Sequence, residues 1–252
     1  MQPGAYSVVA AALMGQRHLE IAANNLANVN TVGFKAERPM FELNQETQAP
    51  DAASRLGPGL VRRSRWAGSH IDYTGGKTQQ TGNPLDLAIG NPGFFVIQSP
   101  NGLRYTRAGQ FTISSNQEIV TSQGWPLLGT NGQPIRVRTG GGPIAVGYGG
   151  EVLMGGQAAG KIQVVDFPRP YRLFKEQGSV FGVVDPAERG TPVATPQIAQ
   201  GTLEMSNVSA IKEMVGLIET ARQFEAYQKV IQSFDAMSDR AVNDLGRSQL
   251  NT

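Results

Sequence analysis

The sequence predicts an α+β protein with a helix at each end and a central, mostly β domain of short antiparallel strands. Apolar residues recur at helical spacing near both ends, whereas the middle is rich in glycine, proline and short strand-like runs. Both terminal patterns carry apolar residues on more than one face, which is typical of helices in a coiled-coil-like assembly region. We divide the chain into an N-terminal assembly helix and turn (1–35), an extended connector (36–84), a central β-domain (85–200) and a C-terminal assembly helix (201–252).

The first helix is predicted from about Tyr6 to Leu26. Val9 and Leu13 share one face of it, while Ala12 and Leu19 lie on nearly the opposite face. Leaving five large apolar side chains in water would cost about 8 to 15 kcal/mol, which is comparable to the stability of a whole domain. We therefore expect these faces to be covered. Either an intramolecular antiparallel helix pair or an assembly interface between copies would cover them.

The connector is polar and punctuated by glycine between about Phe41 and Thr81. Its weak periodicity predicts extended chain with one or two strands. From Leu85 onward the pattern becomes clearly β, with short apolar or alternating runs separated by turn dipeptides such as Asn101-Gly102 and Asn131-Gly132. The predicted strands lie at 85–89, 94–97, 105–107, 111–113, 134–137, 151–154 and 162–167.

The C-terminal helix is predicted from Ser209, a plausible N-cap residue, to Leu245, with Gly246 as its stop. Its apolar residues form two stripes, because a 3.6-residue turn drifts against a seven-residue repeat. The first stripe contains Ile211, Met214, Val215 and Ile218, and the second contains Phe224, Tyr227, Ile231 and Phe234.

Composition excludes several classes of protein. Among the 252 residues, 22 Lys and Arg oppose 20 Asp and Glu, and a net charge of +2 is too small to indicate nucleic-acid binding. The chain contains no cysteine, which rules out disulfides and thiolate sites. We expect no membrane span, because no run of 18 apolar residues occurs, and no cleaved signal peptide, because the N-terminal segment lacks that pattern.

Catalytic and cofactor motifs are missing or defective. The segment from Gly155 to Lys161 matches a phosphate-binding loop until Ile162 replaces the required hydroxyl residue. The two histidines, His18 and His70, have no metal-ligand spacing around them. The sequence therefore predicts a protein that is not an enzyme, with no cofactor, no metal site and no catalytic residues.

Residues 23–35 read Ala-Asn-Asn-Leu-Ala-Asn-Val-Asn-Thr-Val-Gly-Phe-Lys. This segment resembles the signature of bacterial flagellar rod and hook proteins, in which a helix rich in Ala and Asn ends in a Thr-x-Gly-Phe-Lys turn. An ordinary helix cap would explain Gly33, which suits a positive φ, but not the Asn-rich run. Segments 85–97 and 105–111 resemble the middle domain of this family, and 206–231 resembles its C-terminal helix.

The resemblance implies a structural subunit of the flagellar basal-body rod, which polymerises through its terminal helices and transmits torque across the periplasm. The implied partners are other copies of the chain, other rod proteins, the flagellar type III export apparatus and the surrounding ring proteins. The implied location is the periplasmic rod, reached without a cleaved signal peptide. The Ala-Arg-Gln-Phe-Glu run at 221–225 favours the larger proximal rod type over the distal rod type, which stays open.

One alternative comes from a different class of protein. A soluble binding module would pair the two helices within one chain and use the β-domain to grip a peptide or a glycan. Under the rod hypothesis, the expected assembly interface comprises Leu13, Asn24, Asn25, Leu26, Asn28, Gly33, Phe34, Ile211, Met214, Ile218, Phe224, Tyr227, Ile231 and Phe234.

Overall fold

The computed structural model describes residues 3–46, 61–138, 140–185 and 188–249. The chain forms two compact units. The helical unit comprises Met1–Ala27, Glu37–Asp72 and Ser209–Thr252, and the β unit comprises Asn28–Ala36 and Tyr73–Val208. The predicted terminal helices and the mostly β centre of antiparallel strands are therefore confirmed.

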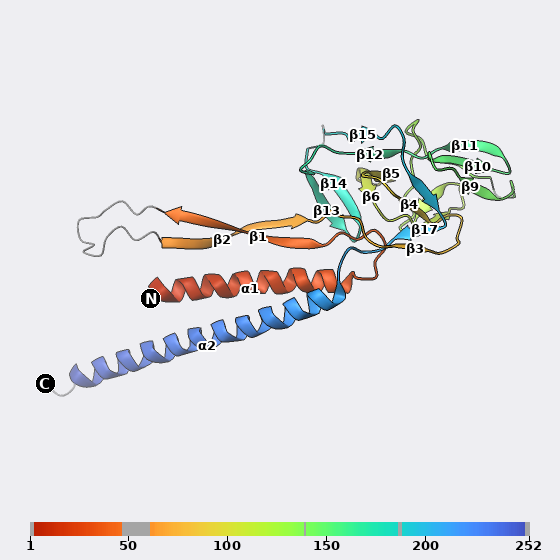
Figure 1. Cartoon of the computed structure of the whole chain (residues 1–252). Helices are drawn as coiled ribbons and strands as arrows, with labels where there is room; N and C mark the ends of the chain where they lie inside the picture. Colours follow the sequence, from red (N-terminus) through yellow and green to blue (C-terminus); the bar gives the residue numbers. More distant parts are fainter. Residues whose placement is uncertain (1–2, 47–60, 139, 186–187, 250–252) are drawn as a thin grey trace. The chain divides into compact units, whose positions relative to one another are not determined.

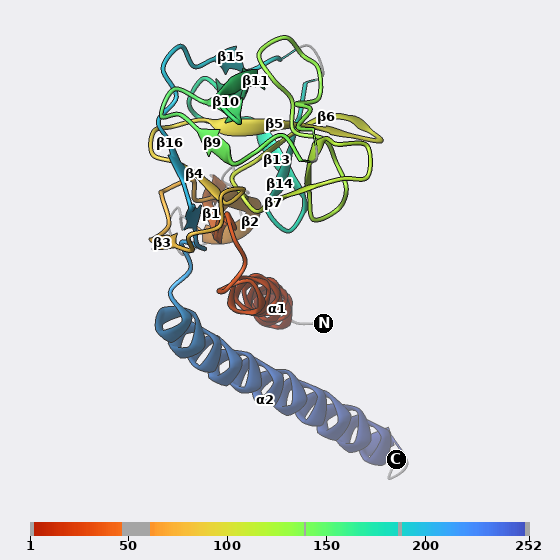
Figure 2. The same cartoon turned by 90° about the vertical axis from the view of Figure 1, so that its right-hand side faces the viewer.

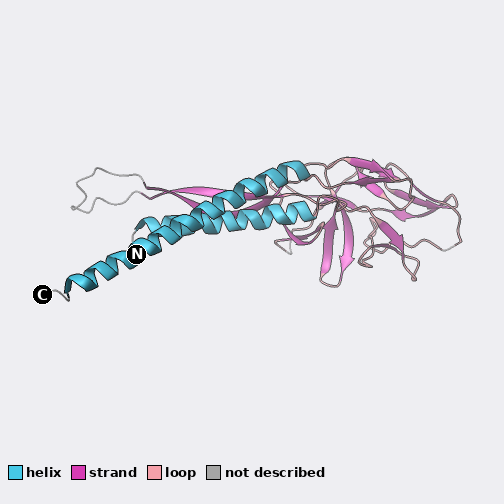
Figure 3. Cartoon of the chain, turned by 90° about the horizontal axis from the view of Figure 1, so that it is seen from below, coloured by secondary structure: helices cyan, strands magenta, loops and turns pink. Residues whose placement is uncertain are grey.

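In the helical unit, α1 (Pro3–Ala27) and α2 (Ala210–Gln249) lie side by side (Figure 1, Figure 3). His18 Nδ1 lies 3.4 Å from Thr220 Oγ1, and the Asn25 amide lies 3.5 Å from the Glu213 carboxylate. Because residues later in α1 meet residues earlier in α2, the pair is antiparallel.

The remaining part of the helical unit is a two-stranded antiparallel ribbon of β1 (Glu37–Glu46) and β2 (Val61–Ile71). A β-bulge lies between Met40 and Phe41, where the Phe41 ring meets Trp66 edge-on at 5.9 Å. The ribbon packs on α1 through β1, so that α1 lies between the ribbon and α2 (Figure 2). The connector, predicted as extended chain with one or two strands, therefore contains two strands that pair with each other.

The β unit is built around a six-stranded antiparallel sheet of order β13-β14-β6-β5-β12-β15. A three-stranded sheet, β11-β10-β9, and the pairs β16-β4, β17-β3 and β7-β8 complete it. The bounds are β3 Thr78–Gln80, β4 Leu87–Ile89, β5 Phe94–Ser99, β6 Gly102–Thr106, β7 Phe111–Ile113, β8 Ile119–Thr121, β9 Ile144–Val146, β10 Glu151–Met154, β11 Gln157–Lys161, β12 Val164–Asp166, β13 Leu173–Gln177, β14 Val180–Val183, β15 Thr191–Pro192, β16 Ile198–Gln200 and β17 Thr202–Glu204.

The core of the β unit is a cluster of buried aliphatic and aromatic side chains, with Phe95 and Phe111 edge-to-face at 5.3 Å. A second aromatic group surrounds Phe94, which packs against Tyr73, Tyr171 and Phe181. The pairing of β16 with β4 and of β17 with β3 brings the end of this unit back to its beginning.

Two sequence expectations need correction. The helix stop at Gly246 is wrong, because α2 continues to Gln249. Glycine in a helix costs about 1 kcal/mol relative to alanine, which weakens a helix without ending it. The predicted strand at 134–137 is also wrong, because Pro134 and Arg136 make isolated bridges only. Proline 134 cannot donate a ladder hydrogen bond, which limits pairing there.

Candidate assembly surface

The side of α2 that does not face α1 carries four apolar residues near its start, at Ile211, Met214, Val215 and Ile218. These side chains are between 45% and 73% exposed. Their spacing of three, one and three places them on one face of the helix. We call these four residues the α2 stripe. Isolated apolar residues on a surface are ordinary. Four on one helix face form a contiguous apolar patch, whose exposure to water is unfavourable.

A smaller apolar patch lies on α1. Leu13 is 59% exposed, and Val9, one turn earlier, is also exposed. We call Val9 and Leu13 the α1 patch. The next turn of the same face carries Arg17, which pairs with Glu20 at 2.8 Å. Among the described side chains of α1, the large apolar ones that are exposed are therefore Val9 and Leu13.

The faces that α1 and α2 turn toward each other carry small or partly covered side chains. Ala12 and Ala22 of α1 are buried, and so is Thr220 of α2. A Cβ added at Gly15 would lie 3.8 Å from the Phe224 ring, so the two helices approach closely at this level. The predicted seam residues Phe224, Tyr227, Ile231 and Phe234 are half-buried, and so is Leu26 of α1.

Asn25 is buried where α1 ends, and its amide holds three parts of the helical unit together. Its nitrogen donates to the Glu37 carbonyl and its oxygen accepts from the Glu37 N–H, both at 2.9 Å. The nitrogen also lies 3.5 Å from the Glu213 carboxylate, which Arg38 approaches at 3.4 Å. Asn25 thus connects α1, β1 and α2 within one chain. Its neighbour Asn24 is exposed.

The turn that follows α1 belongs to the β unit. Asn28 opens it by accepting from the backbone N–H and the hydroxyl of Thr31, each at 3.1 Å. Gly33 has φ +67°, and an added Cβ would lie 2.3 Å from the Ala108 backbone nitrogen. Any side chain at position 33 would therefore collide with backbone. The resemblance singled out Gly33, and its close approach to the 107–108 backbone gives the physical reason for a glycine.

Phe34 is fully buried against Ala36 and Val208, and the Lys175 ammonium lies 3.3 Å from the centre of its ring. Phe34 thereby attaches the chain leaving α1 to the chain that leads into α2. Asn207 supports the same junction, since its side-chain oxygen accepts from the Ala36 N–H at 2.7 Å.

A buried ion network lies next to this junction. The Lys35 ammonium, 1% exposed, contacts the Glu204 carboxylate at 2.6 Å and the Thr74 carbonyl at 2.7 Å. The other carboxylate oxygen of Glu204 accepts from Arg107 at 3.2 Å. One largely buried carboxylate therefore pairs with two cations, one through each of its oxygens. Sequence reasoning did not include Lys35, Arg107 or Glu204 among the site residues, because the lysine and the glutamate stand 169 positions apart.

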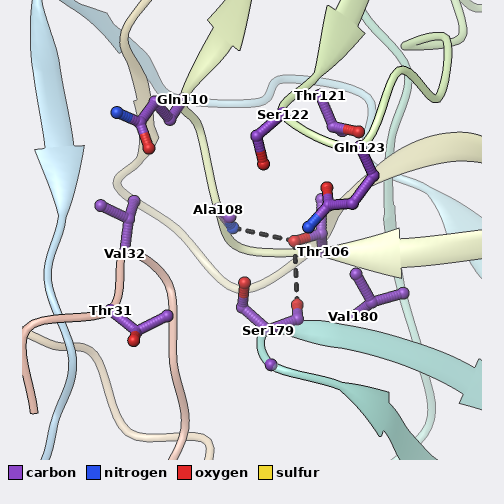
Figure 4. Close-up of a pocket in the computed structure, with 11 residues that line it drawn as sticks. Thr31, Val32, Thr106, Ala108, Gln110, Thr121, Ser122, Gln123, Ser179 and Val180 are labelled. Carbon is purple, nitrogen blue, oxygen red and sulfur yellow. Dashed lines mark hydrogen bonds between the residues drawn. The ribbon is translucent and has the colours of Figure 1, made fainter. Parts of the chain in front are cut away.

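The β unit also contains a polar cavity of about 170 Å³ (Figure 4). Its walls carry hydroxyl, amide and small apolar groups. The Thr106 hydroxyl donates to the Ser179 carbonyl at 2.9 Å and accepts from the Ala108 N–H at 3.0 Å. The cavity walls thus offer no acid and base pair for catalysis. The lining residues are Thr31, Val32, Thr106, Ala108, Gln110, Thr121, Ser122, Gln123, Gly178, Ser179 and Val180.

Within the described residues, no group of three or more His, Cys, Asp and Glu side chains converges as a metal would require. Neither helix in the same part of the chain contains a stretch apolar enough to span a bilayer. The exposed apolar residues on α1 and α2 are therefore the surface that most needs a functional explanation.

Comparison with known proteins gives matches along most of the chain. Three family models match: "Flagella basal body rod protein" over residues 11–35, "Flagellar hook protein FlgE/F/G D1 domain" over 88–154 and "Flagellar basal body rod FlgEFG protein C-terminal" over 199–245.

Individual relatives align over nearly their whole length. The flagellar basal-body rod protein FlgF of Caulobacter vibrioides is 36% identical over 232 residues, covering 92% of this chain and 93% of the relative. FlgF of Mesorhizobium japonicum is 33% identical over 98% of this chain and 99% of the relative. The flagellar basal-body rod protein FlgG of Bacillus subtilis is 32% identical over 94% of this chain and 97% of the relative.

Proposed function

The chain belongs to the flagellar basal-body rod protein family, and on that premise we propose that it is a structural rod subunit that polymerises through α1 and α2. Its location is the basal body. The main observation that supports polymerisation is the α2 stripe. Its four residues are apolar, lie on one face of the helix and are exposed in a single chain. Covering such a stripe stabilises a complex by roughly 25 cal/mol for each Å² of apolar surface removed from water.

The mechanism follows from the kind of contact that the two patches make. The α1 patch and the α2 stripe are different surfaces, and a contact that joins them in one direction from copy to copy is heterologous and builds an open filament when the rotation does not close into a ring. Repeated contacts of this kind produce a helical tube. Torque then passes from subunit to subunit through packed helices rather than through flexible connections.

The finer parts of this function are also proposals. We infer that the chain crosses the inner membrane through the flagellar type III export apparatus and turns inside the periplasmic ring proteins. We also infer that it acts by assembly and carries out no reaction, which the structural character of its family supports.

Within the family, we favour the proximal rod protein FlgF. Two relatives with this name align with the chain at 33% and 36% identity, and the Bacillus subtilis FlgG aligns at 32%. The identities differ little. A third relative named FlgF is 31% identical, so the identities of the two types overlap and the preference comes from the Ala-Arg-Gln-Phe-Glu run at 221–225.

The binding-module alternative shares one feature with the structure, since α1 and α2 do pair within one chain. That alternative requires the pair to cover the apolar faces of both helices. The exposed α2 stripe and α1 patch argue against it, because a monomeric module gains nothing from leaving them in water.

An epitope-tagged chain, expressed as the sole copy in a motile host lacking its own version, tests the proposal. The tag should be recovered in isolated basal bodies and motility should return. Recovery of the tag entirely in the soluble fraction, with motility restored, would contradict a role as a rod subunit.

A further inference from the structure

The α1 patch and the α2 stripe lie at different levels of the helix pair. Contacts between Gly15 and Phe224, His18 and Thr220, and Asn25 and Glu213 fix the register within one chain. In that register Leu13 lies level with about residue 225 of α2. The α2 stripe is centred about 11 residues nearer the start of α2, or about 16 Å along the axis.

The two helices also differ in length. In the same register the first residue of α1, Pro3, lies level with about residue 235 of α2. The α2 helix continues to Gln249 and so extends about 14 residues, or about 21 Å, beyond its partner (Figure 1, Figure 3). We call this part of α2 the overhang. Within the part of the helical unit that the structure describes, α1 does not reach it.

We propose that a second copy of this chain packs on the helix pair with an axial displacement of about 16 Å, which sets its α1 patch against the α2 stripe. The inference rests on the proposed function and specifies the contact that function needs. In this arrangement the α2 of one copy runs antiparallel to the α1 of the next. Leu13 then lies opposite Met214 and Val215, and Val9 lies opposite Ile218.

The size of the overhang supports this displacement independently of the patches. Shifting one copy by about 11 residues carries its overhang alongside the first half of α1 in the other copy. The overhang is about as long as the shift, so a staggered stack leaves little of α2 without a neighbour.

The flanking residues fit the same arrangement. Both patches end at charged residues, with Arg17 and Glu20 after the α1 patch and Glu219 and Arg222 after the α2 stripe. The contact therefore has an apolar centre and a charged border, as stable protein interfaces do.

Engineered cysteines test the displacement directly, because the chain has no cysteine of its own. The double variant Leu13→Cys with Met214→Cys is expressed as the sole copy, cells are oxidised, and basal bodies are analysed by non-reducing immunoblot. Disulfides require Cα atoms about 4.4 to 6.8 Å apart. Within one chain these positions differ by about 16 Å in level, so a bond between them must join two copies.

The matched control is Ala23→Cys with Asp235→Cys, two exposed positions that differ by at least about 13 Å in level both within one chain and across the proposed contact. We expect covalent dimers and longer ladders from the first pair, several-fold above the control and above either single cysteine. Equal cross-linking in both pairs, or cross-linking in the control alone, would overturn the displacement.

The same preparation separates this inference from the proposed function. Tagged chain present in basal bodies without dimers through positions 13 and 214 overturns the staggered contact and leaves the rod function standing. If the cysteine variant is absent from basal bodies while the unmodified chain is present, the cysteines block the contact. The double variant Leu13→Ala with Met214→Ala is then tested in the same way. Recovery of that variant in basal bodies at the normal level would overturn the inference.

Discussion

The β unit buries its large apolar side chains, whereas the helical unit leaves several of its own exposed. In the β unit, large residues such as Phe95, Phe111 and Phe181 are fully buried. In the helical unit, among the side chains described, the buried apolar residues are Ala12 and Ala22, while the α2 stripe is exposed. The β unit therefore has a core of its own. The helical unit depends on neighbours to cover its apolar surface.

The chain carries a convenient reporter for this comparison. It has two tryptophans, Trp66 in the helical unit and Trp125 in the β unit. Trp66→Phe leaves a fluorescence signal for the β unit alone, and Trp125→Phe leaves one for the helical unit alone. Denaturant titrations of the two single-tryptophan backgrounds then give a free energy of unfolding for each unit.

The largest loss of stability is expected from Glu204→Gln. The variant removes the carboxylate charge that Lys35 and Arg107 contact, and breaking a buried pair in this way typically costs about 3 to 5 kcal/mol. Trp125 fluorescence in urea measures the loss. The control is Glu151→Gln, whose pair with Lys161 is exposed and should contribute no more than about 1 kcal/mol. Equal losses in the two variants would contradict the burial of this network.

The next effect concerns the glycine after α1. Gly33→Ala should destabilise the β unit by clearly more than Gly132→Ala. Both glycines have positive φ, +67° and +73°, so both variants carry the left-handed strain of about 1 to 2 kcal/mol. An added Cβ would collide with backbone at Gly33, but nothing lies within 4 Å of it at Gly132. The same titration measures both, and matching losses would refute a role for the close approach.

A smaller loss is expected in the helical unit from Asn25→Ala. The variant leaves the Glu37 N–H and carbonyl without their partner, and an unsatisfied buried polar group costs about 1 to 3 kcal/mol. Trp66 fluorescence in the Trp125→Phe background reports it. Gln16→Ala, at an exposed position of the same helix, should change the value by less than about 0.5 kcal/mol. No difference between the two variants would show that Asn25 does not join the elements of this unit.

Tyr73→Phe should change little at neutral pH and should matter in alkali. The Tyr73 hydroxyl is buried and makes no hydrogen bond among the described residues, so its removal should be neutral or slightly stabilising. Burial, and then the neighbouring Tyr171, raise the pKa of Tyr73 well above its usual value of about 10.

The sign of the pH effect follows from that shift. Above about pH 10 the unfolded chain releases the phenol proton while the folded chain keeps it, so the free energy of unfolding falls as the pH rises. Burial also raises the pKa values of Tyr105 and Tyr171, so part of the fall should remain in the variant. Trp125 fluorescence between pH 7 and pH 11 should show a shallower fall for Tyr73→Phe. Parallel curves would contradict the assignment.

The difference between the units also explains which features the sequence could predict. Both terminal helices were predictable because 3.6-residue periodicity is a local signal, and strands such as β10 were predictable from a short apolar run between turns. Local patterns do not reveal which strands pair. The return of β17 to β3, which places Glu204 next to Lys35, depends on contacts between residues far apart in sequence.

The residues of the candidate assembly surface also differ in how far the sequence could predict them. The apolar spacing at Ile211, Met214 and Ile218 predicts one helix face, and the structure places all three on the exposed side of α2. Their contact with other copies remains a proposal. For Asn25, Gly33 and Phe34 the structure gives contacts within the chain, which a helical repeat or a turn motif cannot specify. Periodicity shows that a face is apolar, but not what covers it.

The central claim is that the α2 stripe serves assembly and not the stability of the single chain. Ile218→Asp tests it most directly, with Gln223→Asp at an exposed position of the same helix as the control. We predict that both variants unfold within about 0.5 kcal/mol of the parent, because both positions face water in a single chain. We further predict that Ile218→Asp alone is missing from isolated basal bodies and loses motility. Recovery of Ile218→Asp in basal bodies at the level of the control, with normal motility, would contradict the account.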